Sequence, residues 1–99
     1  MAKKNTNKQY GCRKEREARK ILLAEGARYV LRTRGSLGQF DLLAVYDNHT
    51  KWISVKSGAD AYVKRCIREW NDLHETLPPY HVPELWVYWR QRRKWERLT

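Results

Sequence analysis

The chain has 99 residues, the length of one small domain. Its 21 lysines and arginines outnumber its 11 acidic residues, and the resulting net charge of +10 favours a polyanionic partner, nucleic acid before an anionic membrane. No apolar run approaches the roughly 18 residues of a membrane-spanning helix, and the Lys-rich start leads into no apolar signal segment. We therefore expect an intracellular, cytoplasmic protein without a membrane partner.

Cysteine and histidine usage gives little sign of a metal cluster. Cys12 and Cys66 lack the spacing of metal ligands and lie in helical patterns, which indicates reduced intracellular thiols. The histidines are scattered along the chain, so a zinc site is not expected.

Hydrophobic periodicity and turn residues divide the chain into two helices and four strands. In chain order, the sequence predicts a flexible basic arm over 1–9, a helix over 10–25 that Gly26 stops, strands over 28–34, 39–46 and 51–56, a helix over 60–77 and a last strand over 85–89. Turns are expected at 35–38 and 47–50, prolines 78, 79 and 83 precede the last strand, and a basic tail begins at Arg90. The order α-β-β-β-α-β over 10–99 predicts a single α+β domain with helices flanking a mixed sheet.

Glu15 occupies an unusual position on the first predicted helix. At about 100° per residue, Gly11, Ala18 and Leu22 cluster on one side of that helix, and Glu15 falls within the same stripe. A solvated acid has no reason to lie there, whereas a metal ligand reaching towards the sheet does. The alternative is a carboxylate at the edge of the core, paired with a nearby arginine.

Asp41 and Lys56 place one charge on each of two successive apolar strands. A buried or half-buried charge is costly unless a partner compensates it. Alternation places Ser54 and Lys56 on one face of the strand over 51–56, with Ile53 and Val55 on the other. If the first face meets a cleft containing Asp41, the Lys56 ammonium lies beside a metal site, where it can stabilise charge on a phosphate.

These motifs resemble one known family. The similar segments are Gly11-x3-Glu15-Arg-Glu, the later Gly26, Arg34-Gly-Ser-Leu-Gly-Gln-Phe-Asp41 and Ile53-Ser-Val-Lys56. Together they look like the archaeal-type Holliday junction resolvases of the PD-(D/E)XK nuclease superfamily. The resemblance covers residues 10–60 closely and the remainder only by element order and basic character.

The resemblance implies a restriction-endonuclease-like core and a magnesium-dependent endonuclease, for which Mn²⁺ is a possible substitute. Such an enzyme acts as a symmetric homodimer on four-way DNA junctions. The resemblance makes Glu15 and Asp41 metal ligands, Lys56 the catalytic lysine and Ser36 an auxiliary loop residue near the scissile phosphate. Without it, the loop around Ser36 reads as an ordinary turn.

The chain departs from the family pattern at two places. Gln39-Phe40 precedes Asp41 where a proline is expected, although the chemistry requires only the carboxylate. Ser54 replaces an acidic residue, so the metal loses one negative ligand. Glu15, Asp41, a strand carbonyl at Val55 and water molecules would then hold the magnesium. Either the enzyme tolerates Ser54 in the site with more water, or its activity is impaired.

DNA affinity is expected from basic residues at both ends and around the cleft. The candidates are Lys3, Lys4, Lys8, Arg13, Arg32, Arg34, Arg90, Arg92, Arg93 and Lys94. Charge runs are also common on ordinary solvated faces. Trp86, Tyr88 and Trp89 are expected in the core or at a dimer interface.

Three other functions are compatible with the sequence. The chain could bind junction or duplex DNA without cutting it, which Ser54 favours. It could be a related PD-(D/E)XK nuclease that acts on another DNA structure. A small RNA-binding protein is the third, but it leaves Glu15 and Asp41 unexplained.

Overall fold

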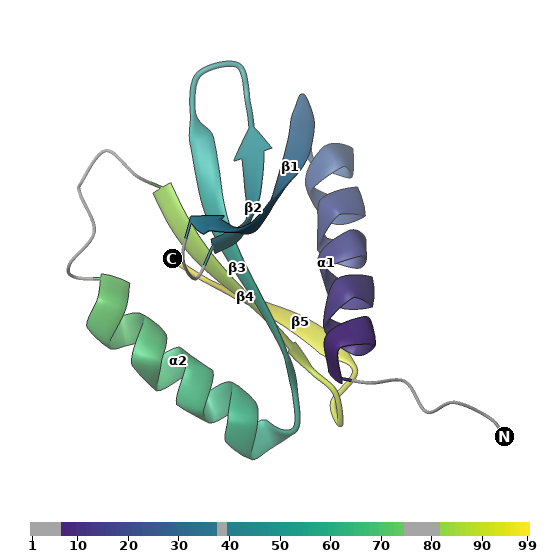
Figure 1. Ribbon diagram of the computed structural model, residues 1–99, viewed down its shortest axis with the longest axis vertical. Coiled ribbons are helices and arrows are strands. Elements are labelled where there is room, and N and C mark those ends of the chain that lie inside the picture. The colour runs from purple at the N-terminus through teal and green to yellow at the C-terminus, as the bar shows by residue number, and fades with distance from the viewer. Residues whose placement is uncertain (1–6, 38–39, 75–81) are drawn as a thin grey trace, which may run out of the picture.

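The computed structural model describes residues 7–37, 40–74 and 82–99, without the side chains of residues 7–10, 34–37, 73 and 74. It contains two helices and a five-stranded mixed sheet (Figure 1). The elements are α1 (Asn7–Ala24), β1 (Tyr29–Leu37), β2 (Phe40–Val45), β3 (Thr50–Gly58), α2 (Asp60–His74), β4 (Val82–Trp89) and β5 (Lys94–Leu98). Neither helix of this part of the chain is long and apolar enough to cross a membrane.

The strands lie in the order β1-β2-β3-β4-β5. Neighbouring strands are antiparallel except β3 and β4, which are parallel because α2 forms the connection between them. Helix α1 covers one face of the sheet and α2 the other (Figure 1). The predicted α+β class, the mixed sheet and the flanking helices are confirmed.

Alternation along the strands builds a separate apolar core beneath each helix. Ala18 and Leu22 of α1 are fully buried in a cluster with Ile53 and Val55 of β3. The cluster beneath α2 joins residues at helical spacing with alternate residues of β4, and its members include Val63, Trp70, Leu85, Val87 and Trp89. Trp86, which is fully buried, lies in the first cluster instead. The prediction that Trp86 and Trp89 belong to the core is confirmed.

Gly26 ends α1 as predicted. Its φ of +109° lies in the left-handed region that favours glycine. The Ala27 N–H donates to the Leu22 carbonyl and the Gly26 N–H to the Leu23 carbonyl, at 3.1 and 3.3 Å. These two bonds form a Schellman motif, which satisfies carbonyls that the helix end would leave unpaired.

Several boundaries differ from the sequence prediction. The helix predicted over 60–77 is α2 as far as His74, and residues 75–77 lie outside the described residues. Helix α1 already begins at Asn7, within the segment expected to be a flexible arm, and the rest of that arm lies outside the described residues. The turn expected at 35–38 is wrong at its start, because β1 continues to Leu37 and pairs there with Phe40. Pro83 lies inside β4 rather than before it, near the strand start where proline is tolerated.

The expected basic tail is also wrong. Residues 94–98 form β5, an edge strand paired with β4 from Leu85↔Leu98 to Trp89↔Lys94. A hairpin turn, with Arg93 at a φ of +54°, joins the two strands. The order of elements is therefore the predicted one with one more strand at its end.

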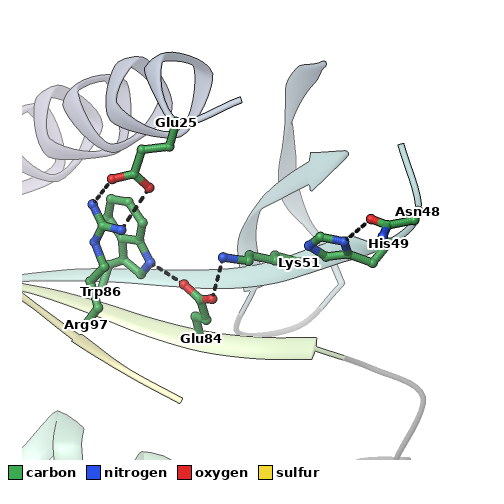
Figure 2. Close-up of polar contacts among 7 residues, drawn as sticks. All are labelled: Glu25, Asn48, His49, Lys51, Glu84, Trp86 and Arg97. Atoms are coloured by element: carbon green, nitrogen blue, oxygen red, sulfur yellow. Dashed lines mark hydrogen bonds and ion pairs between the residues drawn. The ribbon is translucent and has the colours of Figure 1, made fainter. Parts of the chain in front are cut away.

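A polar network ties β5 to the end of α1 and to the middle of the sheet (Figure 2). The Arg97 guanidinium donates to both carboxylate oxygens of Glu25, at 2.9 and 2.6 Å, and lies 4.0 Å from the centre of the Trp86 ring. The Trp86 indole N–H donates to Glu84 at 2.9 Å, and Lys51 pairs with the same carboxylate at 3.0 Å. These contacts compensate the charge of Glu84, which is buried.

Candidate functional site

One cleft of about 440 Å³ is lined by Glu15, Asp41 and Lys56. The first and last of these residues are 41 positions apart in the sequence. The cleft lies where the end of β3 meets the N-terminal halves of both helices. Its lining consists of Gly11, Glu15, Asp41, Val55, Lys56, Ser57, Gly58, Ala59, Tyr62 and Arg90. The fold therefore brings together the three residues that the sequence singled out.

Glu15 reaches the cleft because of its position on α1. Ala18 and Leu22, on the same stripe of the helix, are fully buried against the sheet, while the Glu15 side chain is 20% exposed. Gly11, one turn earlier, leaves open space where a side chain would stand. The stripe predicted from the sequence thus changes from core to cleft along the helix, with Glu15 at the boundary.

Asp41 is fixed by the point at which β2 and β3 separate. The ladder between these strands runs from Val45↔Thr50 to Leu42↔Ile53. Beyond it, the backbone N–H of Val55 donates to Oδ2 of Asp41 at 2.8 Å. A side-chain carboxylate therefore satisfies a strand donor and is held in one orientation at the mouth of the opening sheet.

The two carboxyl groups have raised pKa values. Burial raises the pKa of Glu15 most, the negative charge of Asp41 raises it further, and Arg32 and Lys56 oppose the shift. Burial also raises the pKa of Asp41, against the hydrogen bond from Val55 and the charges of Lys56 and Arg32. Two partly desolvated carboxylates that repel each other favour a bound proton or a bound cation.

The donor set fits a hard divalent cation. Glu15 and Asp41 supply carboxylate oxygens, the ligand type that Mg²⁺ takes from proteins together with several water molecules. Val55, whose carbonyl was the predicted third ligand, lines the cleft, and its N–H orients Asp41. In the described part of the chain, no three His, Cys, Asp or Glu residues form a group, so the acidic ligands here are two.

The two serines predicted for the site are not seen in it. Ser54 is 2% exposed, pairs with Leu85 in the ladder between β3 and β4, and does not line the cleft. The side chain of Ser36 lies outside the described part of the molecule, and its backbone belongs to β1. Their assignment to the site remains a prediction.

Arg32, predicted to contact DNA, lies against the site itself. Its Nε is 3.5 Å from Oε1 of Glu15, and its Nη2 is 3.8 Å from Sγ of Cys12. The sequence left open that Glu15 is a carboxylate at the edge of the core, paired with an arginine, and Arg32 is such a partner. The pair nevertheless lies beside the cleft that Asp41 and Lys56 also line.

The other predicted DNA contacts fall into three groups. Arg13 is exposed on α1, and Arg90 lines the cleft. Arg92 and Arg93 follow in the turn between β4 and β5, and Lys94 is the first residue of β5. Arg92 pairs with Asp60 at 3.3 Å and lies 4.1 Å from the centre of the Trp89 ring. Lys3 and Lys4, and the side chains of Lys8 and Arg34, lie outside what the structure describes.

Sequence reasoning missed Tyr62, which forms one wall of the cleft. Its ring packs against Gly58, where an added Cβ would stand only 2.8 Å from Cδ2 of the tyrosine. The one available signal was the glycine itself, which follows Lys56 by two residues and comes two residues before a predicted helix. A glycine in a strand often marks the close approach of another group, and Gly58 is the last residue of β3.

Comparison with known proteins adds no identity. A scan against models of protein families finds no match, and a search of curated proteins finds no matching sequence. The function of the chain therefore rests on the chemistry of the cleft.

Proposed function

We propose that this protein is a metal-dependent DNA endonuclease that resolves four-way (Holliday) junctions, with a restriction-endonuclease-like PD-(D/E)XK core. The observation that carries the proposal is the convergence of Glu15, Asp41 and Lys56 from α1, β2 and β3 on one cleft. Two carboxylates that repel each other favour the binding of a divalent cation between them. The Lys56 ammonium beside them favours the binding of a phosphate. A structural ion pair would need only one acid and one base.

Each side chain has a distinct role in phosphodiester hydrolysis. Glu15 and Asp41 would hold a Mg²⁺ or Mn²⁺ ion, which when bound supplies charge neutralisation and acidifies a water molecule. The Val55 N–H keeps the Asp41 carboxylate aimed at the cleft. Lys56 stabilises the negative charge that develops on the phosphate oxygens as a water oxygen attacks phosphorus and the bond to the leaving sugar oxygen breaks.

The charge distribution supports DNA as the substrate. Arg90 lines the cleft, Arg92 and Arg93 follow it in the turn after β4, and Lys94 begins β5. Arg92 pairs with Asp60, the residue after Ala59 of the cleft lining. In a chain with a net charge of +10, such groups hold phosphates and position the duplex without reading its bases. The preference for four-way junctions and the homodimer that matches their twofold symmetry follow from the sequence resemblance and belong to the proposal. The intracellular location also belongs to the proposal and follows from the cysteine usage and the lysine-rich start.

The test is cleavage of an end-labelled immobile four-way junction beside linear duplex of the same arms. With Mg²⁺ or Mn²⁺, we expect paired, symmetric nicks confined to the junction, and none with a chelator. Asp41→Asn should remove cleavage and leave junction binding largely intact, whereas Asp72→Asn, an exposed acid on α2, should cut like the wild type. Cleavage that survives Asp41→Asn would refute the assigned site.

One observation favours a second function, junction binding without cleavage. Ser54 is buried, and the described part of the site offers a metal only two carboxylates. Tight junction binding by the wild type without nicks, with either Mg²⁺ or Mn²⁺ present, would indicate that state. Flap and single-stranded substrates in the same assay would reveal a related nuclease with another DNA preference.

A further inference from the structure

A second hollow lies beside the cleft and shares Glu15 with it. It has a volume of about 190 Å³ and is lined by Cys12, Glu15, Arg16, Arg19 and Arg32. Residues 12, 16 and 19 follow one face of α1 at i, i+4 and i+7, and Arg32 comes from β1. The hollow is therefore built by a regular helical face against the neighbouring strand.

Like charges dominate this hollow. Three guanidinium groups face one carboxylate, so the formal charge of its lining is +2 (three minus one). Glu15 is already engaged by Arg32, at 3.5 Å, and Arg16 and Arg19 are exposed. Three cations gathered in one place repel each other, and an anion that enters between them lowers this energy. A solvated helix face has no need to gather its arginines around a concavity.

We infer that this hollow binds a backbone phosphate of the DNA strand, next to the phosphate that is cut. The inference rests on the proposed function and adds a second phosphate site to it. Guanidinium groups present five N–H donors in a planar fork that matches phosphate oxygens, so Arg16, Arg19 and Arg32 suit this ligand. None of them reads a base, and the site accepts any sequence.

Its position gives the second site a purpose. Because Glu15 lines both hollows, a strand with one phosphate in the cleft passes the second hollow at a neighbouring nucleotide. Two fixed phosphates set the register of the strand, whereas one leaves it free to turn about that phosphate. The arginine hollow thus holds the scissile phosphate in line with Glu15 and Asp41.

The first experiment measures DNA binding without metal, so that it does not depend on cleavage. Fluorescently labelled junction and duplex are titrated with wild type, Arg19→Ala and Arg68→Ala over a series of salt concentrations, in the presence of a chelator. Arg19→Ala should weaken binding and lower the slope of log affinity against log salt by about 0.9, the effect of one lost phosphate contact. Arg68→Ala removes an arginine that is also exposed, on α2, and should change the slope far less.

The second experiment locates the phosphate. Single neutral methylphosphonates are placed at each position around the junction centre. At one position beside the cleaved phosphate, the neutral group should weaken wild-type binding but cause little further loss in Arg19→Ala. Two outcomes would overturn the second site while leaving the nuclease proposal intact. In the first, every methylphosphonate weakens the binding of Arg19→Ala as much as that of the wild type. In the second, Arg19→Ala and Arg68→Ala have equal effects. A wild type that binds no DNA would instead refute the proposed function itself.

Discussion

Replacing Asp41 with asparagine should have opposite effects on stability with and without a divalent metal. Burial raises the pKa of Asp41, and its charge raises the pKa of Glu15. A carboxyl whose pKa is raised by folding holds its proton more tightly in the folded state, so its ionisation at neutral pH destabilises that state. The amide oxygen of asparagine can still accept the hydrogen bond from the Val55 N–H, at 2.8 Å in the wild type. Without metal, the variant should therefore be more stable than the wild type.

The metal should reverse this order, because only the wild type offers two anionic ligands. At a metal concentration ten times the dissociation constant, binding to the folded state adds about 1.4 kcal/mol to the free energy of unfolding. For a chain of 99 residues, this corresponds to a rise in melting temperature of roughly 6–11 °C. The rise should be largely absent in Asp41→Asn.

Thermal unfolding followed by circular dichroism, over a titration of Mg²⁺ and then Mn²⁺, measures both effects without DNA. Asp72→Asn is the matched control and should keep the wild-type metal response, since that acid is exposed on α2. An equal metal-induced rise in Asp41→Asn and wild type would refute Asp41 as a ligand. A metal-free Asp41→Asn that unfolds at a lower temperature than wild type would refute the repulsion between the two carboxylates.

Three further predictions concern pH and packing. The ordinary pKa values of the Asp41 and Glu15 carboxyls are 3.8 and 4.5, and folding raises both. The metal-free protein should therefore lose stability as the pH rises from these values through the raised ones. Denaturant unfolding should show a smaller loss in a variant that lacks one of the two carboxyls. Gly58→Ala brings a Cβ within 2.8 Å of the Tyr62 ring. Overpacking of this kind costs about 1–3 kcal/mol, and the lower conformational entropy of the unfolded alanine variant offsets about 0.5–1 kcal/mol of that cost. A urea midpoint above that of the wild type would contradict this packing. Lys51→Met removes the ammonium partner of the buried Glu84 carboxylate, which keeps the hydrogen bond from the Trp86 N–H. The change should cost about 3 kcal/mol, at the low end for a broken buried pair because Lys51 is 26% exposed. Unchanged stability in urea would show that this pair does not stabilise the fold.

The sequence determined the local elements and the identity of the central residues. Glu15 was found because helical periodicity places it among Ala18 and Leu22, and periodicity is written directly in the chain. Gly26 predicted the end of α1 because a left-handed C-cap favours that residue. Asp41 and Lys56 stood out as charges in apolar strands, and the fold places both in the cleft with Glu15.

Only the tertiary structure decided what surrounds these residues. Strand β5 carries mostly charged, exposed residues, so its sequence shows no apolar alternation that would predict a strand. It is a strand because it pairs with the edge of β4. The contact of Arg32 with Glu15 and the wall formed by Tyr62 join residues far apart in sequence. Local patterns record which face a side chain occupies on its own element, whereas partners across elements depend on where the sheet opens and how each helix crosses it. The sequence therefore singled out the candidate site residues, and the fold supplied their neighbours.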